Sequence, residues 1–173
     1  MSTRNAPDDA DVVAAALELG RRLQALGWMV ATVESCTGGL VARALTEVGG
    51  SSAWFERGFV TYSNDAKIEL VGVSAATLAE HGAVSEPVAA EMAAGGLARS
   101  RARLALALTG IAGPSGGAPG KPVGTVCFGW ASAEGGRRTG TVLFEGDRAA
   151  VRRKAALYAL RQALVLLPDS PEG

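Results

Sequence analysis

The residues of this chain best suited to chemistry lie in one short segment, Glu34-Ser35-Cys36-Thr37-Gly38-Gly39. The segment follows an apolar, β-branched run typical of a buried strand and precedes a predicted helix. A hydroxyl on such a turn can face a cleft, so Ser35 is a candidate nucleophile. Gly38 and Gly39 let a ligand approach closely, and free N–H groups at a helix start attract an anion or a developing oxyanion. In the alternative interpretation, Ser35 or Thr37 only caps the helix.

A serine nucleophile needs a base, and the chain has a single histidine, His81, beside Gly82 at the predicted end of a helix. A helix-terminal position accounts for His81, so the base is expected elsewhere. A lysine can serve when desolvation or nearby positive potential lowers its pKa. Lys67 follows a predicted strand and is the best candidate, with Tyr62 as a proton relay or hydrogen-bond partner. The alternative is that Lys67 is an ordinary surface lysine.

A second strand exit, residues 109–117, is also rich in glycine. It could form a pocket wall or donate backbone N–H groups to a phosphate, or it could be a surface loop without a ligand. The first exit matches neither a P-loop nor a dinucleotide-binding fingerprint. It is not a nucleophile elbow either, because Val33 and Thr37 stand where that motif has glycines.

The composition excludes several classes of protein. The 173 residues include 17 basic and 17 acidic ones, so the chain lacks the surplus of Lys and Arg that neutralises nucleic-acid phosphates. No apolar run approaches the roughly 18 residues that span a bilayer, and the polar start is not a secretory signal. Cys36 and Cys127 provide neither a disulfide framework nor a metal-ligand spacing. We therefore expect a cytoplasmic protein without metal, other cofactor, nucleic-acid partner or membrane partner.

Strands and helices alternate along the chain, which predicts a three-layer α/β/α domain with a mixed, mostly parallel sheet. One domain is expected over residues 9–168, between flexible tails at 1–8 and 169–173. Asp9 or Asp11 is the predicted cap of the first helix, and the pair Gly95-Gly96 in a later helix indicates close backbone packing. The expected helices cover residues 12–26, 38–48, 64–70, 74–81, 85–100 and 147–167, and the expected strands cover 28–33, 54–62, 104–108, 123–132 and 138–144.

Three strand exits, taken in their order along the chain, resemble those of the CinA C-terminal domain family. The resemblance is strongest to the stand-alone nicotinamide-nucleotide amidohydrolases of that family. The third exit is Tyr62-Ser63-Asn64, with Lys67 one turn into the helix that follows. The similarity runs from about residue 12 to residue 166. The matching segments, besides Lys67, are residues 32–39, 50–55, 58–64, 81–85, 109–114, 121–126 and 146–148.

The resemblance implies hydrolysis of the carboxamide of nicotinamide mononucleotide to nicotinate mononucleotide and ammonia, without a metal. It implies a catalytic serine and lysine at Ser35 and Lys67, assisted by Tyr62. A substrate-binding arginine is expected at Arg148, with Arg152 as the alternative. Longer family members carry an N-terminal domain associated with nucleotide pyrophosphatase activity, which we do not expect here. The other residues expected around the substrate are Cys36, Thr37, Gly38, Gly39, Ser52, Thr109, Gly110 and Gly113.

A different class of function stays open at this point: a nucleotide-binding or regulatory module of the competence/damage-inducible type, with the same fold and no turnover. The presence of Ser35, Tyr62 and Lys67 together favours the enzyme, because a binding protein needs no such set. The sequence also leaves the oligomeric state open, including a homodimer formed through the first or last helix.

Overall fold

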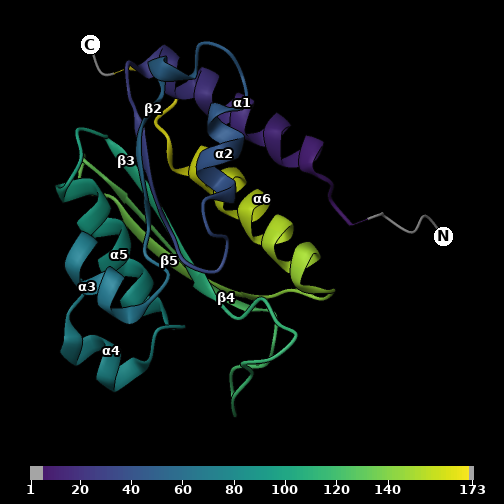
Figure 1. Cartoon of the computed structure of the whole chain (residues 1–173). Coiled ribbons are helices and arrows are strands. Elements are labelled where there is room, and N and C mark those ends of the chain that lie inside the picture. The colour runs from purple at the N-terminus through teal and green to yellow at the C-terminus, as the bar shows by residue number, and fades with distance from the viewer. Residues whose placement is uncertain (1–5, 172–173) are drawn as a thin grey trace.

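The computed structural model describes residues 6–171 and contains one five-stranded sheet with helices on both faces (Figure 1). No helix within these residues is long and apolar enough to cross a membrane. The strands are β1 (Val30–Glu34), β2 (Phe55–Val60), β3 (Leu104–Gly110), β4 (Thr125–Ser132) and β5 (Arg137–Leu143). The helices are α1 (Asp9–Leu26), α2 (Leu40–Thr46), α3 (Asn64–Val71), α4 (Ala75–His81), α5 (Glu86–Ala98) and α6 (Arg148–Leu166), with a 3₁₀ turn η1 (Ser51–Ala53).

The strands are ordered β2-β1-β3-β4-β5 across the sheet. β1 pairs in parallel with both β2 and β3, whereas β4 pairs antiparallel with both β3 and β5. Only β4 therefore runs against the other strands of this sheet. α1, α2 and α6 cover one face, and α3, α4 and α5 cover the other (Figure 1). The predicted three-layer α/β/α fold with a mixed, mostly parallel sheet is confirmed.

β1 is buried along its whole length, which explains its apolar and β-branched composition. A parallel strand with neighbours on both edges and helices on both faces requires such residues. Val30 packs into the core formed with α1, α2 and α6, whereas Val33 packs against α5. Because successive side chains point to opposite faces, Glu34 shares the α2 side with Val30. The strand thus delivers the turn that follows it to the carboxyl edge of the sheet.

The larger core lies between the sheet and α6. Phe128 and Trp130 of β4 stack with ring centroids 5.7 Å apart, and Tyr158 of α6 lies 4.8 Å from Phe128. α6 lies close to the sheet because its buried face consists largely of small side chains. The buried alanines of α6 are Ala150, Ala155, Ala156, Ala159 and Ala163.

The start of α1 differs from the prediction. The N-cap is Asp8, and neither Asp9 nor Asp11 holds that position. The Asp8 carboxylate accepts a hydrogen bond from the Asp11 N–H at 3.0 Å, and the Asp11 carboxylate accepts one from the Asp8 N–H at 2.9 Å. This reciprocal arrangement satisfies two backbone donors at the helix start. Asp8 therefore belongs to the domain, and the predicted tail residues 1–5 and 172–173 lie outside the described residues.

α2 begins at Leu40, two residues later than predicted. Gly38 and Gly39 have φ angles of 59° and 103°, in the left-handed region that residues with a Cβ rarely adopt. These glycines therefore form the turn and do not belong to the first turn of the helix.

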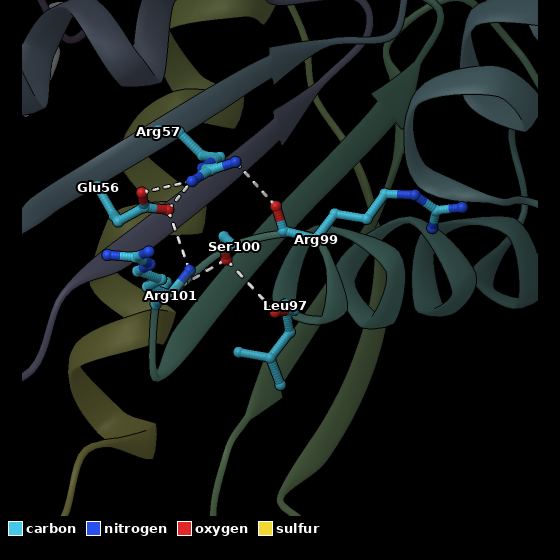
Figure 2. Close-up of polar contacts among 7 residues, drawn as sticks. Glu56, Arg57, Leu97, Arg99, Ser100 and Arg101 are labelled. Atoms are coloured by element: carbon cyan, nitrogen blue, oxygen red, sulfur yellow. Dashed lines mark hydrogen bonds and ion pairs between the residues drawn. The ribbon is translucent and has the colours of Figure 1, made fainter.

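An ionic cluster attaches the α5–β3 connection to the edge strand β2, at the end of the sheet opposite to this turn (Figure 2). The Glu56 carboxylate accepts hydrogen bonds from Arg57 Nε at 2.7 Å and from the Arg101 N–H at 3.2 Å. Arg57 Nη1 donates to the Arg99 carbonyl at 3.1 Å. The hydrogen bond from Arg57 lowers the pKa of Glu56, so the carboxylate stays charged. The cluster holds the chain where it re-enters the sheet as β3.

Gly95 and Gly96 give α5 close contact with two neighbouring elements, as the sequence predicted. A Cβ at Gly95 would lie 1.8 Å from the carbonyl oxygen of Val71 in α3. A Cβ at Gly96 would lie 2.4 Å from Cγ2 of Val33 in β1. The glycine pair therefore sets how closely α5 packs against α3 and β1.

Gly95→Ala is expected to lower the free energy of unfolding by about 1–3 kcal/mol, because the added methyl overlaps backbone and α5 must move. Urea unfolding followed by circular dichroism measures the change. Gly49→Ala is the control, since no atom lies within 4 Å of a Cβ at that position. A Gly95→Ala variant as stable as the unmodified protein would contradict this packing.

Candidate active site

The segment after β1 forms a tight turn anchored to the neighbouring strand. The Ser35 N–H donates to the carbonyl of Leu108 in β3 at 3.1 Å, and the Gly38 N–H donates to the Ser35 carbonyl at 3.0 Å. Ser35 is 8% exposed, so its hydroxyl lies just below the surface. The turn therefore holds a serine side chain at the carboxyl edge of the sheet, where ligands of open α/β sheets bind.

Lys67 meets this serine from the next strand exit. Its Nζ lies 3.2 Å from Ser35 Oγ, although the two residues are 32 positions apart in the chain. The Ser63 hydroxyl accepts from the Ala66 N–H and caps α3, which places Lys67 in the first turn. Lys67 is only 1% exposed, so the interpretation as a surface lysine is wrong.

Backbone carbonyl oxygens surround the rest of the Lys67 amine. Nζ lies 2.9 Å from the carbonyl oxygen of Thr61, 3.2 Å from that of Tyr62 and 3.5 Å from that of Ser63. Burial lowers the pKa of Lys67 from its ordinary value, because the charged form loses hydration. The carbonyls oppose this shift, since they accept hydrogen bonds from an ammonium group. No carboxylate within residues 6–171 forms an ion pair with Lys67.

A neutral amine has two N–H groups and one lone pair, and the site provides a partner for each. The two N–H groups can donate to the nearest carbonyls, those of Thr61 and Tyr62, which directs the lone pair toward Ser35 Oγ. In the protonated state the ammonium donates to Ser35 Oγ, and the serine hydroxyl can donate to the Tyr62 carbonyl at 3.4 Å. The geometry therefore allows a proton to pass between Ser35 and Lys67.

Thr61 joins the two strand exits, and sequence reasoning missed it. Its N–H and its hydroxyl donate to the Glu34 carbonyl at 2.7 Å and 3.3 Å, while its own carbonyl accepts from Lys67. The side chain is completely buried. In the sequence Thr61 is one more residue of a predicted strand, and nothing in its type marks this role.

Tyr62 contributes to two places. Its backbone carbonyl accepts a hydrogen bond from Lys67. Its side chain is exposed, and the hydroxyl accepts a hydrogen bond from Arg148 Nη2 at 3.3 Å. Arg148 Nη1 donates to the Gly113 carbonyl at 2.9 Å. Tyr62, Arg148 and Gly113 thus form a rim beside the Ser35–Lys67 pair. The proton-relay role of the Tyr62 hydroxyl stays a prediction.

Thr109 and Gly110, at the end of β3, lie next to the turn because Leu108 pairs with Glu34 at the end of β1. The Thr109 hydroxyl donates to the Ala83 carbonyl at 3.0 Å and so fixes the connection between α4 and α5 against β3. The structure therefore brings the predicted glycine-rich exit to the same edge of the sheet as Ser35 and Lys67.

Ser52 lies elsewhere. It belongs to η1, which precedes β2, whereas Tyr62 follows β2. At about 3.3 Å per residue, the length of this strand separates Ser52 from the exit that carries Tyr62. Within this chain, the structure does not bring Ser52 together with Ser35.

Arg152 supports the turn from α6 and was only the alternative to Arg148 in the sequence-based expectation. Its Nε donates to the Cys36 carbonyl at 3.1 Å, and its Nη2 donates to the Thr37 carbonyl at 2.9 Å. Arg152 also lines a cavity of about 930 Å³ between α1, α2 and α6. This cavity reaches the turn at Thr37, but neither Ser35 nor Lys67 lines it.

The residues next to Ser35 carry a thiol and several backbone N–H groups, which differ in their ability to interact with a ligand. Burial raises the pKa of the Cys36 thiol to about 11, so the thiol stays protonated near neutral pH and is a poor nucleophile. The N–H groups of Cys36, Thr37 and Gly39 make no hydrogen bond to other described residues, although Thr37 is completely buried. Within the described chain, no group of three or more His, Cys, Asp or Glu side chains could hold a metal ion.

The protein is an α/β domain in which a serine hydroxyl contacts a buried lysine amine at the carboxyl edge of the sheet. The family model described as the CinA C-terminal domain matches residues 13–167, and the chain belongs to this family. It is 55% identical over 153 residues to the Escherichia coli (strain K12) protein named nicotinamide-nucleotide amidohydrolase PncC, covering 88% of this chain and 93% of that protein. It is 56% identical over 148 residues to the protein of the same name from Enterobacter agglomerans, covering 86% and 90%.

Solved structures of similar proteins share the fold along nearly the whole chain. The competence/damage inducible protein CihA from Agrobacterium tumefaciens superposes with a TM-score of 0.89 at 44% identity, covering 96% of this chain and 99% of that one. A CinA superfamily protein from Escherichia coli superposes with a TM-score of 0.87 at 40% identity, covering 93% and 94%.

The geometry predicts that a fluorophosphonate will label Ser35 in a reaction that depends on Lys67. Ser35 Oγ would bond to phosphorus as fluoride leaves, and its proton would pass to the neutral amine. The labelling rate should rise with pH and level off above the pKa of Lys67, at a midpoint below lysine's ordinary 10.5. Lys67→Met should slow labelling by about 10²-fold or more.

Mass spectrometry identifies the labelled residue and its rate of formation, and Lys154→Met on α6 serves as the control lysine. Labelling of a different residue, or an unchanged rate in Lys67→Met, would contradict the assignment.

Proposed function

We propose that the protein deamidates nicotinamide mononucleotide to nicotinate mononucleotide and ammonia, with Ser35 as nucleophile and Lys67 as base. The observation that carries this proposal is the 3.2 Å contact between Ser35 Oγ and a lysine amine that is almost completely buried. The substrate is inferred from the relatives that are named nicotinamide-nucleotide amidohydrolases. The free thiols Cys36 and Cys127 are consistent with a reducing cytoplasm as the place of reaction. The reaction uses no metal or other cofactor.

In the first half of the reaction, neutral Lys67 takes the proton of Ser35 while Oγ attacks the carboxamide carbon. The negative charge moves to the carboxamide oxygen, which the N–H groups of the turn stabilise. The tetrahedral intermediate collapses when the Lys67 ammonium returns the proton to the amide nitrogen. The carbon–nitrogen bond breaks, ammonia leaves, and an ester links the substrate's acyl group to Ser35.

In the second half, water attacks the ester carbon and gives its proton to Lys67. The new oxyanion occupies the same donors of the turn. Collapse breaks the bond to Ser35 Oγ, which recovers its proton from Lys67. The acid product leaves, and the neutral amine is restored for the next cycle.

The rim beside the pair is the proposed place for the substrate phosphate. Arg148 provides a guanidinium whose Nη1 and Nη2 already lie at the Gly113 carbonyl and the Tyr62 hydroxyl. A guanidinium pairs with phosphate through two parallel hydrogen bonds, so Arg148 is well suited to this role. Arg152 donates to carbonyls of the turn itself, which favours a supporting role for that residue.

A ligand-binding module without turnover is the competing interpretation, and the environment of Lys67 argues against it. Burying a lysine without an ion-pair partner is costly, and a binding protein gains nothing from placing its amine against a serine hydroxyl. A base that must be neutral to act benefits from that same burial.

The direct test is to incubate the purified protein with nicotinamide mononucleotide and to measure both ammonia and the acid product. Lys67→Ala should lower kcat by about 10²- to 10⁴-fold, and Ser35→Ala should abolish detectable turnover. Ser100→Ala is the control, because the Ser100 hydroxyl, in the α5–β3 connection at the other end of the sheet, donates to the Leu97 carbonyl (Figure 2). Tight binding of the mononucleotide without ammonia release would favour the non-catalytic module instead.

Arg148→Ala is expected to raise KM for the mononucleotide by about 10- to 100-fold with a small effect on kcat, because charge-assisted hydrogen bonds to phosphate are lost. Nicotinamide riboside, which lacks the phosphate, provides the matched comparison. Its kcat/KM should be the same for Arg148→Ala and the unmodified enzyme. Equal losses on both substrates would show that Arg148 acts on something other than the phosphate.

A further inference from the structure

Glu34 places a buried carboxylate directly before the candidate nucleophile. The side chain is 1% exposed and accepts three hydrogen bonds, one from the turn and two from the first residues of α2. Oε1 accepts from the Thr37 hydroxyl at 2.7 Å and from the Val41 N–H at 2.9 Å. Oε2 accepts from the Ala42 N–H at 3.1 Å. The carboxylate of the last strand residue thus caps α2 across the whole intervening turn.

This contact connects the central strand β1 to the start of α2. The backbone of Glu34 is held by β2 and β3 on both sides, because its neighbours in the sheet are Val60 and Leu108. The first N–H groups of a helix lack partners within the helix, and a negative charge there is favourable. The three hydrogen bonds to the Glu34 carboxylate therefore form a clamp that fixes the start of α2 relative to β1. The turn that carries Ser35 lies between these two elements.

The same hydrogen bonds limit which groups can stabilise an oxyanion. The N–H groups of Val41 and Ala42 are occupied by Glu34, and that of Gly38 is occupied by the Ser35 carbonyl. The first turn of α2 is thus unavailable to the substrate, despite its favourable dipole. The free donors belong to the turn itself, whose shape the carboxylate maintains.

We propose that Glu34 is the positioning residue of the nucleophile: its carboxylate sets the place of Ser35 Oγ against Lys67 and maintains the turn whose free N–H groups stabilise the oxyanion. This inference rests on the proposed function, because it assigns Glu34 a part in that reaction. Glu34 acts through the turn and does not touch the substrate. It takes no proton during the reaction.

A second carboxylate in the fold provides a matched control. Glu91 of α5 accepts from the Ser74 N–H at 2.9 Å and from the Thr77 hydroxyl at 2.7 Å, and so holds the start of α4. Both carboxylates therefore accept hydrogen bonds at the start of a helix. Glu34 does so beside the Ser35–Lys67 pair, whereas Glu91 does so away from it. Equivalent substitutions at the two positions separate a loss of helix capping from a loss of alignment at Ser35.

The experiment compares Glu34→Gln, Thr37→Val and Glu91→Gln in the deamidation assay over a range of pH. A glutamine keeps the length of the side chain, but its amide nitrogen cannot accept a hydrogen bond, so one donor of the clamp loses its partner. Glu34→Gln should lower kcat by about 10- to 100-fold with KM within about twofold, because small misplacements of reacting groups are this costly. The midpoint of the pH profile should stay unchanged, since the carbonyls of Thr61 and Tyr62 still surround the buried Lys67 amine.

Thr37→Val removes one donor of the clamp and should cause a smaller fall in kcat with the same unchanged KM. Glu91→Gln should reduce the thermal stability but leave kcat unaltered. Equal kcat losses in Glu34→Gln and Glu91→Gln would overturn the inference, as would an unchanged kcat in Glu34→Gln. If Glu34→Gln does not fold, an unchanged kcat in Thr37→Val overturns it.

Fluorophosphonate labelling separates this inference from the proposed function. Failure to release ammonia from nicotinamide mononucleotide, with Ser35 still labelled rapidly, would reject the substrate but leave the role of Glu34 measurable. In that case slower labelling in Glu34→Gln and Thr37→Val, with no change in Glu91→Gln, supports the positioning role. Equal labelling rates in all these variants overturn it.

Discussion

The amine of Lys67 lies among backbone carbonyls with no ion-pair partner in the described chain, and much of the surrounding architecture keeps it there. Removing such a group from water is unfavourable unless its hydrogen bonds are satisfied. The carbonyl oxygens of Thr61 and Tyr62 accept hydrogen bonds from the amine. They can do so because α3, which carries Lys67, begins directly after these residues. Burial lowers the pKa of the amine, and the remaining position around nitrogen faces Ser35. The site is therefore a consequence of where one helix starts.

Parallel pairing of β1 and β2 makes that position possible. Two neighbouring parallel strands end at the same edge of a sheet, so the residues after them are adjacent in space. Thr61 sets the distance between the two strand exits. It donates a hydrogen bond to the Glu34 carbonyl at one exit and accepts one from Lys67 at the other. On the opposite side of the turn, Arg152 binds the Cys36 and Thr37 carbonyls from α6. Elements from both helical layers thus converge on one short segment.

Most of the fold could be predicted because its signals are local. The apolar run of β1, the left-handed glycine after α1 and the side-chain caps at Ser63, Ser85 and Asp147 all act on neighbouring backbone. The errors also have local physical causes. Asp8 precedes the predicted caps because a reciprocal pair with Asp11 satisfies more donors, and α2 starts late because its first two predicted residues adopt left-handed φ angles.

The sequence by itself determined which side chains could serve in catalysis: one histidine at a helix end, few lysines, and a serine on a strand-to-helix turn. It also determined the family, whose ordered motifs run along nearly the whole chain. Only the tertiary structure decided that Lys67 is buried against Ser35, that Ser52 lies at the far end of β2, and that Thr61 joins the two strand exits. These relations depend on strand pairing and helix packing. They join residues that no local pattern connects.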